Sequence, residues 1–539
     1  MSRGAAAQGR LLTSWAPSPF AFCFSRCAPS AISFSYYGIR AIIALYMTDF
    51  LKFSKDDATV IVHSFILVTC LCSLLGGVLS DSYLGKYRTV VYMSFVYIAG
   101  ATTLAVSSAP ELLGGKPPPL AIVFLAFFLI ALGVGGINPC LNAFVGDQFV
   151  GGKEDLLSSL YHLFYLSVNV GSIFSFMTIP LLREHINYGA AFGMPIALFF
   201  LCTIVFFAGR KHYTMVAPGR HALPEMWNVI RTARAERAEA RRQGERIESP
   251  LLDYAKPICG QAAVDGVRAV LDVIKVFTPL PIFWALYDQQ TSRWVFMAAD
   301  MDRRLGDFVL TADQVNFLNP MLLLLLIPFF DHAVYPFLRW CGLALRPLFR
   351  MGSGMLLTGF AFIAAGMLQR QIEAAGPGKI SIVNILPQYL LLSCGEIMLS
   401  ITGLEFAYSQ APRSMKSVIM SIWFVTAALG NLLVVVIAKQ PFVSRSYEFF
   451  FYAGLMFVFL FVFQIIACGY HYRPIHSTSV PAGGRADGII PATSGAAKTS
   501  SRGVSFDEDN SASGSRSKRG KGGRHQGRSK KRDKGYEQI

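Results

Sequence analysis

The order of apolar and polar positions divides this chain into long apolar runs separated by short polar segments. A membrane helix needs about 20 mostly apolar residues to cross the hydrocarbon core, and the runs have that length. Six are expected near residues 30–50, 59–80, 87–108, 120–143, 158–181 and 187–208. Six more are expected near 274–291, 314–338, 346–368, 382–403, 417–438 and 449–470. The pattern predicts an all-α membrane protein with twelve transmembrane helices in two six-helix halves.

The polar segments between the runs set the expected domain boundaries. We expect an N-terminal segment at 1–29, six-helix bundles at 30–208 and 271–472, a cytoplasmic linker at 209–270 and a tail at 473–539. The linker stretch RTARAERAEARRQGERIES places Glu and Arg at the close spacing that supports a helix. It predicts a solvated linker helix, with a helix lying on the membrane surface as the alternative.

Composition supports this class and excludes others. The chain is 53% hydrophobic and 15% charged, whereas about a quarter of the residues in a soluble domain are charged. The opening residues MSRGAAAQGRLLTSWAPS lack the apolar core of a removable signal peptide. The ten Cys and nine His show neither a metal-ligand spacing nor a disulfide framework. We therefore expect no cofactor, no metal and no enzyme activity.

Basic residues gather in the loops on one side of the alternating spans. They are Lys86, Arg88, Arg210, Lys211, Arg339, Arg346, Arg350, Arg413 and Lys416, in the loops after spans 2, 6, 8 and 10. Short basic loops stay in the cytoplasm. Both termini are therefore expected to be cytoplasmic.

The tail carries half of the net charge of +16, with 14 Lys and Arg against 6 Asp and Glu in 473–539. It is rich in Gly and Ser, so disorder is expected. Its stretch RSKRGKGGRHQGRSKKRDK has the composition of a nucleic-acid patch. Beside twelve spans, attraction to anionic lipids is the preferred interpretation, and no nucleic-acid partner is expected.

The loop between spans 2 and 3 contains a spaced motif. In GGVLSDSYLGKYRT, a G-x-x-x-D-x-x-x-G-K-x-R pattern is formed by Gly77, Asp81, Gly85, Lys86 and Arg88. Glycines permit close helix approach, and charges at a cytoplasmic helix end can hold neighbouring helices. The motif resembles the conformational loop of the major facilitator superfamily, whose two six-helix halves rock around a central site.

Further stretches narrow the resemblance. They are FSYYGIRAIIALY (34–46), GINPCLNAFVGDQF (136–149), FYLSVNVGS (164–172), FWALYDQQTSRW (283–294) and GEIMLSITGLEFAYSQAPRSMKS (395–417). From about residue 34 to 470 the chain resembles the proton-dependent oligopeptide transporters, especially animal-type di- and tripeptide symporters. The large extracellular insert of animal members between spans 9 and 10 is absent, since only about 369–381 is available there.

The resemblance implies a substrate site that clamps the two ends of a short peptide. Arg40 can give bidentate, charge-assisted hydrogen bonds to a carboxylate, and Glu396 can hold the ammonium. An ionisable residue inside a membrane span is a functional candidate by default. The alternative for each is a structural ion pair between helices. Glu405 is interpreted as a structural partner of Lys416 or of a backbone amide.

Other positions match the lining of the family's cavity. The polar matches in the first half are Tyr37, Tyr46, Tyr97, Tyr165 and Asn169. The expected aromatic walls are Phe283, Trp284, Tyr287 and Trp423. Aromatic rings combine apolar contact with a polar edge, which suits side chains of varied chemistry.

Proton coupling needs groups that titrate. His63 matches the family's essential histidine, and imidazole titrates near physiological pH. Asp288 and Asp331 are the other candidates. The family pairs the acid at Asp331 with a base in span 7, but this chain has Asp272 there with Lys275 one turn later. Any such gate pair must therefore be rearranged.

The chain departs from the family where span 1 begins. The family's E-x-x-E-R is replaced by Pro29, Ile32 and Ser33, and its span-4 lysine by Asn138. Replacing all members of a buried ionic group is often neutral, whereas removing one is costly. Two explanations are open. One is that the charged group is replaced as a whole, with Arg26 partly substituting for the missing arginine, and the other is that the first exon of the gene is assigned incorrectly. The second does not explain Asn138.

These observations lead to one preferred function and two alternatives. We expect a secondary active transporter that imports di- and tripeptides, driven by protons, in which Ile32, Ser33 and Asn138 weaken the coupling. A same-fold transporter of another small solute, such as nitrate or histidine, is the first alternative. A non-transporting sensor or scaffold is the second. The expected location is the plasma membrane, with the lysosomal or endosomal membrane as the alternative.

Overall fold

The computed structural model describes residues 19–109, 117–147, 154–215, 222–244, 249–342, 346–410 and 416–472. Within these ranges the regular structure is helical apart from one two-stranded hairpin. Strands β1 (Arg304–Leu305) and β2 (Phe308–Val309) pair antiparallel, with Arg304 opposite Val309. The predicted tail, 473–539, and residues 1–18 lie outside the described residues, so the predictions made for them stay predictions.

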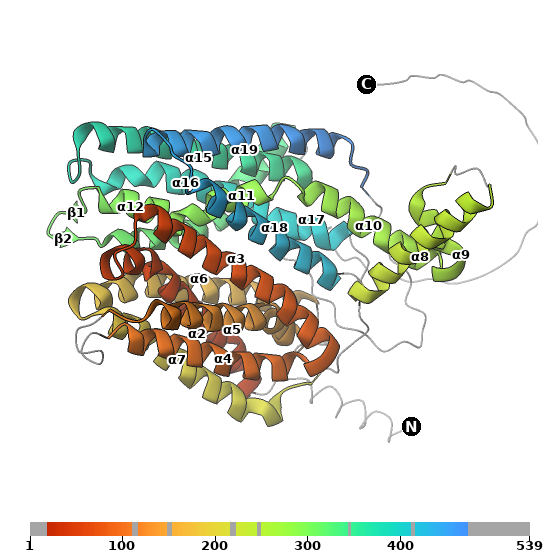
Figure 1. Ribbon diagram of the computed structural model, residues 1–539, viewed down its shortest axis with the longest axis horizontal. Helices are drawn as coiled ribbons and strands as arrows, with labels where there is room; N and C mark the ends of the chain where they lie inside the picture. The colour runs from red at the N-terminus through yellow and green to blue at the C-terminus, as the bar shows by residue number, and fades with distance from the viewer. Residues whose placement is uncertain are drawn as a thin grey trace, which may run out of the picture. The chain divides into compact units, whose positions relative to one another are not determined.

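The first half of the chain forms one group of long helices, drawn in red to yellow in Figure 1. Its helices are α2 (Pro19–Leu45), α3 (Lys55–Leu79), α4 (Lys86–Ser107), α5 (Leu120–Asp147), α6 (Glu154–His185) and α7 (Tyr188–Ala208). Short π or 3₁₀ segments extend three of them, namely η1 (Tyr46–Phe50), η2 (Ser80–Leu84) and η3 (Gly209–His212). Continuations of this kind often accompany functional positions.

The second half is more interrupted. Its helices are α10 (Gln261–Phe277), α11 (Pro281–Tyr287), α12 (Arg293–Ala299), α13 (Leu318–Phe329), α14 (Tyr335–Trp340), α15 (Pro347–Ala375), α16 (Leu386–Glu396), α17 (Thr402–Gln410), α18 (Lys416–Ile437) and α19 (Arg445–Cys468). Between them lie η5 (Asp288–Thr291), η6 (Ala312–Phe317), η7 (Phe330–Val334), η8 (Ile382–Ile385) and η9 (Ile397–Ile401). Only Gly376–Ser381 separates α15 from η8, as the missing insert requires.

Ten described helices are long and apolar enough to cross a membrane, and a bent pair, Gln261–Phe277 with Pro281–Ala299, makes up to eleven. The first predicted span forms α2 and η1. It is not among the helices counted above, because Arg40 and several Ser and Tyr lower its hydropathy. Helix α2 nevertheless packs along α6 and α7. Counting it with the others gives the twelve spans that the sequence predicts.

The seventh span differs from its predicted form. The sequence predicts one span at 274–291, whereas the structure has α10 and the α11–α12 segment inclined at 47° to each other. Helix α10 also begins at Gln261, inside the predicted linker. Proline at the first position of α11 explains the break, because proline lacks the N–H that would continue the helix. The break places Asp288 in the short segment η5 rather than in an α-helix.

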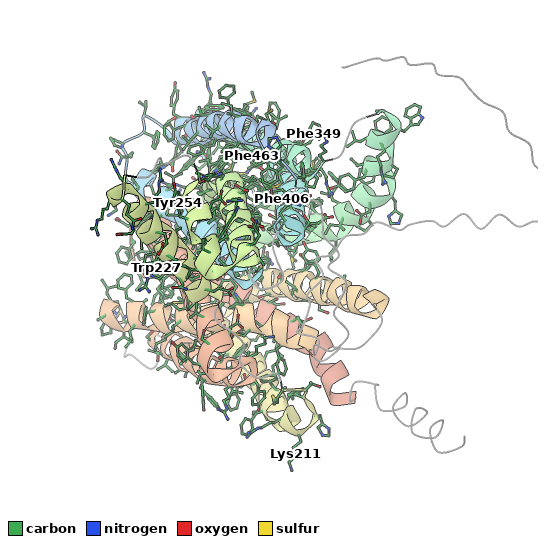
Figure 2. All side chains as sticks on the ribbon, turned by 90° about the vertical axis from the view of Figure 1, so that its right-hand side faces the viewer. Lys211, Trp227, Tyr254, Phe349, Phe406 and Phe463 are labelled. Atoms are coloured by element: carbon green, nitrogen blue, oxygen red, sulfur yellow. The ribbon has the colours of Figure 1, made fainter. Side chains whose placement is uncertain are left out.

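The predicted linker helix is present as α8 (Ala222–Arg242). Val229 and Ala233 are buried, and the helix packs on η4 (Leu251–Ala255). A short helix, α9 (Lys256–Cys259), leads into α10. Figure 1 places α8 and α9 at the end of the helix bundle opposite the β1–β2 hairpin. Figure 2 views the molecule from the α8 end, where Trp227 and Lys211 lie near the viewer.

Asp253 connects this linker to the seventh span. Its carboxylate lies 2.7 Å from the Lys256 Nζ and 2.6 Å from the Arg268 Nη2. Hydrogen bonds from Lys256 and then Arg268 lower the pKa of Asp253 below its usual range. Arg268 belongs to α10, so the pair attaches the linker directly to the start of the bent span.

Small residues set the crossing between α2 and α6. A Cβ atom added to Gly38 would come within 2.5 Å of the Ser175 Oγ. In membranes, glycine allows such close approach of two helices. The Ser175 hydroxyl donates a 2.5 Å hydrogen bond to the Phe34 carbonyl. This contact fixes the part of α2 that carries Tyr37 and Arg40.

Candidate functional site

A cavity lies between the two halves of the helix bundle. Residues of α2, α6, α11, η5, η6, α13 and α16 line it, and about 630 Å³ of space free of atoms lies in it and at its opening. Of the eleven side chains predicted to bind substrate, six line this cavity: Tyr37, Arg40, Tyr165, Asn169, Tyr287 and Glu396. Arg40 comes from the first half and Glu396 from the second, so the cavity holds opposite charges on its two sides.

Arg40 is 8% exposed and is held by residues of η5. Its Nη2 donates a hydrogen bond to the Asp288 Oδ1 and a longer one, 3.4 Å, to the Thr291 Oγ1. Its Nε is buried and has no hydrogen-bond partner among the described residues. A guanidinium has five N–H donors, so Arg40 retains donors for a ligand while Asp288 balances its charge.

Glu396 is the last residue of α16, immediately before the π-helical segment η9. Its carboxylate accepts hydrogen bonds from the Tyr287 hydroxyl, at 3.1 Å, and from the Asn319 Nδ2, at 2.9 Å. Both donors are neutral. The hydrogen bonds orient the carboxylate without cancelling its charge, which leaves it suited to an ammonium ligand.

Five of the predicted binding residues do not line the cavity, and two of them, Tyr46 and Tyr97, belong to the first half. Tyr46 is fully buried among aromatic rings, and its hydroxyl accepts a 2.9 Å hydrogen bond from Ser108. Tyr97 is also fully buried, with its hydroxyl 2.6 Å from the Ser35 Oγ and its ring against Phe199. These contacts make both residues part of the packing of the first half.

The predicted aromatic walls form a layer behind the cavity. Tyr287 lines the cavity, and its ring stacks on Phe283 with centroids 5.8 Å apart. Trp284 contacts Tyr287 on one side and Trp423 on the other, with centroids 5.7 Å and 5.6 Å apart. Phe283, Trp284 and Trp423 therefore support a lining residue and do not themselves line the cavity.

His63 lies in a buried hydrogen-bond network that reaches Arg40. Its Nδ1 is 2.7 Å from the Asn431 Oδ1, and its Nε2 is 2.9 Å from the Ser292 Oγ. The Asn431 Nδ2 donates to the Asp288 Oδ2 at 2.7 Å. Because Asp288 also accepts from Arg40, the network runs from α3 through α18 and η5 to α2.

Asp331 is not part of this network; it lies in η7, and its side chain is exposed. It forms no ion pair with another described residue. Asp272 and Lys275, at the family's span-7 position, pair with each other at 3.0 Å. Glu405 lies 3.9 Å from Arg350, and the side chain of its predicted partner Lys416 lies outside the described residues.

The loop motif begins with Gly77 in α3 and continues through η2 to the start of α4. Gly85 has φ = 78°, which non-glycine residues rarely adopt, and α4 begins at Lys86 directly after it. The Ser80 hydroxyl donates to the Asp81 carboxylate at 3.2 Å. A Cβ added to Gly77 would lie 3.9 Å from the Pro139 Cβ, which is an ordinary contact distance. A Cβ added to Gly76 would lie 2.5 Å from the Gly136 Cα, which is too close. The close helix approach is therefore at Gly76 and not at Gly77, and Arg88 is exposed.

Sequence reasoning missed several polar residues of the site. Asn319 binds Glu396, Thr291 binds Arg40, and Asn431 connects His63 to Asp288. Each stands in or beside an apolar run, as in AALGNLLVVV around Asn431. A buried amide in a membrane span needs partners, and that was a signal available from the sequence. The cavity lining also includes Ser172, Phe176, Gln290 and Asn316.

Ion pairs join the two halves at the end of the bundle that carries the β1–β2 hairpin. Arg183 of α6 binds Asp313 of η6 at 3.0 Å, and Asp313 is fully buried. Arg293 of α12 lies 2.8 Å from Asp56 of α3 and 2.9 Å from Glu448 of α19. Lys55 and Asp300 form a more exposed pair at 2.9 Å.

A cavity with charged walls, placed between two six-helix halves joined at one end, defines an integral, multi-pass membrane transporter of the secondary type. A protein-family comparison agrees, because the model described as PTR2, POT family, matches residues 87–448. The chain belongs to the POT family, which is a family of transporters and not of enzymes.

Individual relatives and solved structures are similar over most of this chain. Peptide transporter family 1 of Drosophila melanogaster is 27% identical, covering 82% of this chain and 86% of the relative. Solute carrier family 15 member 2 of Homo sapiens is 35% identical over 69% of this chain and 52% of the relative. The crystal structure of an auto-inhibited POT family peptide transporter has a TM-score of 0.73 and 31% identity, covering 85% and 99% of the two chains. The transporter PepTSo gives 0.74 and 30%, covering 84% and 98%.

Proposed function

We propose that this chain imports di- and tripeptides by alternating access and that protons drive the transport. The observation that carries the proposal is the cavity, because it presents Arg40 and Glu396 from opposite halves. Short peptides share only an ammonium and a carboxylate, and a site for all of them must bind those two ends. Membership of the POT family and similarity to relatives that are named peptide transporters support the same substrate class.

In the proposed complex, Glu396 receives the peptide ammonium. Its present partners, Tyr287 and Asn319, are neutral donors, so the incoming ammonium supplies the counter-charge. The peptide carboxylate binds Arg40 through donors that Asp288 does not occupy. The first of these is the Nε of Arg40, which is buried and has no hydrogen-bond partner within the described part of the chain.

Charge balance gives a reason for proton coupling. Arg40 carries one positive charge, while Asp288 and Glu396 carry two negative charges when ionised. A zwitterionic peptide leaves this net charge of the site unchanged, but its carboxylate competes with Asp288 for Arg40. A proton added to the site neutralises the one negative charge that is left in excess. The buried charges then balance, which lowers the cost of keeping them away from water.

We infer that His63 takes up this proton and acts on Asp288 through the hydrogen bonds of Asn431. In the neutral ring, Nδ1–H donates to the Asn431 Oδ1 and Nε2 accepts from the Ser292 hydroxyl. A second proton on Nε2 forces Ser292 to turn and accept. Because the other end of Asn431 holds Asp288, the ring's charge is felt at the carboxylate that holds Arg40. Asp331 is a candidate for a later step of proton release.

The two halves, 30–208 and 271–472, are proposed to rock about this cavity. The pairs Arg183–Asp313 and Arg293–Asp56 hold them together at the hairpin end, which we take as the extracellular end. The loop motif at Asp81, Gly85 and Lys86 and the basic loops then face the cytoplasm, with both termini. We propose the plasma membrane as the location, with the lysosomal or endosomal membrane as the alternative.

Uptake into proteoliposomes tests the function. The purified chain is reconstituted and supplied with a labelled dipeptide, with and without an inward proton gradient. Accumulation above the external concentration only with the gradient is expected. Equilibration without accumulation would contradict the coupling, and no uptake of any di- or tripeptide would contradict the substrate class. Nitrate and free histidine are measured in parallel, because their uptake would favour the same-fold alternative.

A further inference from the structure

Helices α3 and α5 touch closely at one end and separate toward the other. Near the α8 end, a Cβ on Gly76 would lie 2.5 Å from the Gly136 Cα, and a Cβ on Gly135 would lie 2.5 Å from the Cys72 Cβ. Toward the hairpin end, α5 carries phenylalanine side chains instead of glycines. Two straight helices that meet at glycines and are spaced by aromatic rings beyond them leave a groove between them.

Matching faces of the two helices line this groove. On α3 they are Ile61, Ser64, Phe65 and Val68, and on α5 they are Phe124, Phe127, Phe128 and Ala131. Both sets have the spacing i, i+3, i+4, i+7 of a single helix face. About 570 Å³ of space free of atoms lies in the groove and at its opening, and its lining carries no charged side chain. Phe124 and Phe128 are 43% and 50% exposed, so the groove opens outward from the bundle.

Both walls belong to membrane spans, so the medium outside the groove is the hydrocarbon of the bilayer. We propose that the groove binds one acyl chain of a phospholipid. A peptide is excluded as occupant, because its amide groups would find no partners there. A sterol is the competing occupant, and the displacement measurement below distinguishes it from a phospholipid chain.

The groove is connected to the substrate cavity by aromatic contacts. Phe127 contacts Phe65 with centroids 5.7 Å apart, and Phe65 stacks on Tyr36 at 6.4 Å. Tyr36 contacts Tyr37 at 5.3 Å, and Tyr37 lines the cavity. The opposite face of the same turn of α3 carries His63. The bound chain therefore supports Phe65 from behind and positions α3 for transport.

Photolabelling tests the occupancy. The full chain is reconstituted with a phospholipid that carries a diazirine in one acyl chain, irradiated and analysed by peptide mass spectrometry. Label should be concentrated on 61–68 and 124–131 relative to other lipid-facing surfaces, such as α19 around Phe461, which is 68% exposed. Even labelling of all lipid-facing helices would overturn the proposal. Displacement of the label by a sterol but not by unlabelled phospholipid would also overturn it.

A filling variant tests the consequence. Val68→Phe places a ring in the groove, and Leu75→Phe is the matched control, on the same helix but 62% exposed outside it. Val68→Phe should lose the groove label and make peptide uptake insensitive to acyl-chain length, whereas the control should behave as the wild type. If Val68→Phe fails to insert, Ser64→Leu provides the same test with a smaller side chain. If a filling variant inserts into the membrane and still takes up the label in the groove, the proposal is contradicted.

Discussion

His63 and Asp288 bind opposite ends of one side chain, the amide of Asn431. The amide oxygen lies 2.7 Å from the His63 Nδ1, and the amide nitrogen lies 2.7 Å from the Asp288 Oδ2. An amide cannot change its charge in this range of pH, but it orients both neighbours at once. A proton on His63 is therefore coupled to the carboxylate that competes with substrate for Arg40.

Replacing Asn431 by leucine should separate proton movement from peptide movement. The side chain keeps a similar volume but loses both hydrogen bonds, so His63 no longer acts on Asp288. Proton-driven accumulation in proteoliposomes should fall to the level of His63→Ala, while exchange of labelled for unlabelled peptide continues. Gln440→Leu is the control, since Gln440 is exposed just beyond the same helix. Full accumulation by Asn431→Leu or by His63→Ala would contradict this role.

Glu396→Gln should weaken the binding of ordinary dipeptides much more than that of N-terminally blocked ones. The charge-assisted bond to the ammonium contributes about 1.5–3 kcal/mol, or roughly ten- to hundredfold in affinity. Asn319 can still donate to the amide oxygen, and the Tyr287 hydroxyl can turn and accept from the amide nitrogen, so the fold of the site is retained. Competition against a labelled dipeptide measures the difference. Equal losses for free and blocked peptides would remove Glu396 from the ammonium site.

Asp288→Asn should make uptake independent of external pH. The amide imitates a protonated carboxyl, so Arg40 no longer shares its charge between Asp288 and the peptide carboxylate. Peptide affinity should rise severalfold at neutral pH, and downhill uptake should persist without accumulation. Arg40→Lys is the companion variant, which should lose affinity for dipeptides but not for peptide amides. A steep pH dependence in Asp288→Asn would show that the coupling group lies elsewhere.

Arg183→Leu should favour opening at the hairpin end. Removing one partner of a buried pair costs about 3–5 kcal/mol, and Asp313 is fully buried where the halves meet. The conformation closed at the hairpin end loses this amount of stabilising free energy. A cysteine introduced in the cavity should therefore react faster with an external thiol reagent. Lys55→Leu is the control, because its pair is exposed and contributes about 0–1 kcal/mol. Equal reactivity in both variants would contradict a closing role for Arg183.

Restoring the family's missing charges should help only when they are restored together. Asn138→Lys alone places a cation in a half-buried position beside Pro139 and should impair transport. Combining it with Pro29→Glu, Ile32→Glu and Ser33→Arg should recover uptake and steepen its dependence on external pH. Peptide uptake by each variant is measured at several external pH values. If Asn138→Lys alone does not impair uptake, and the combined variant shows no steeper pH dependence, the idea of a joint rewiring is contradicted.

The sequence predicts the helical bundle well, because each membrane span must satisfy its own backbone and therefore appears as a separate apolar run. The broken seventh span was less accessible. Pro281 marks a break, but the angle of 47° depends on how α10 and α11 pack. Likewise, Arg40 and Glu396 were predicted from the resemblance and their charge. Their meeting in one cavity depends on the approach of α2 and α16, which no local pattern encodes.

The hydrogen-bond partners were harder to predict than the charged residues. Asp288 was predicted as a titrating group, and the structure adds that it is the ion-pair partner of Arg40. Tyr46 and Tyr97 resemble cavity positions in sequence, yet their hydroxyl groups bind Ser108 and Ser35 within the first half. A helix register of one residue decides whether a tyrosine faces a cavity or a neighbouring helix. Sequence spacing alone does not settle that choice when both faces are buried.

The cluster around Arg293 has a consequence for how the halves part. Asp56 comes from the first half, while Arg293, Glu448 and Arg445 come from the second. When the halves separate, Arg293 and Arg445 keep Glu448, and the half-exposed Asp56 enters water beside Lys55. The second half then keeps two guanidinium groups for one carboxylate, an excess of one positive charge. Opening at this cluster should therefore be easier when an anion from the outer solution balances that charge, and it should depend on which salts bathe the outer face.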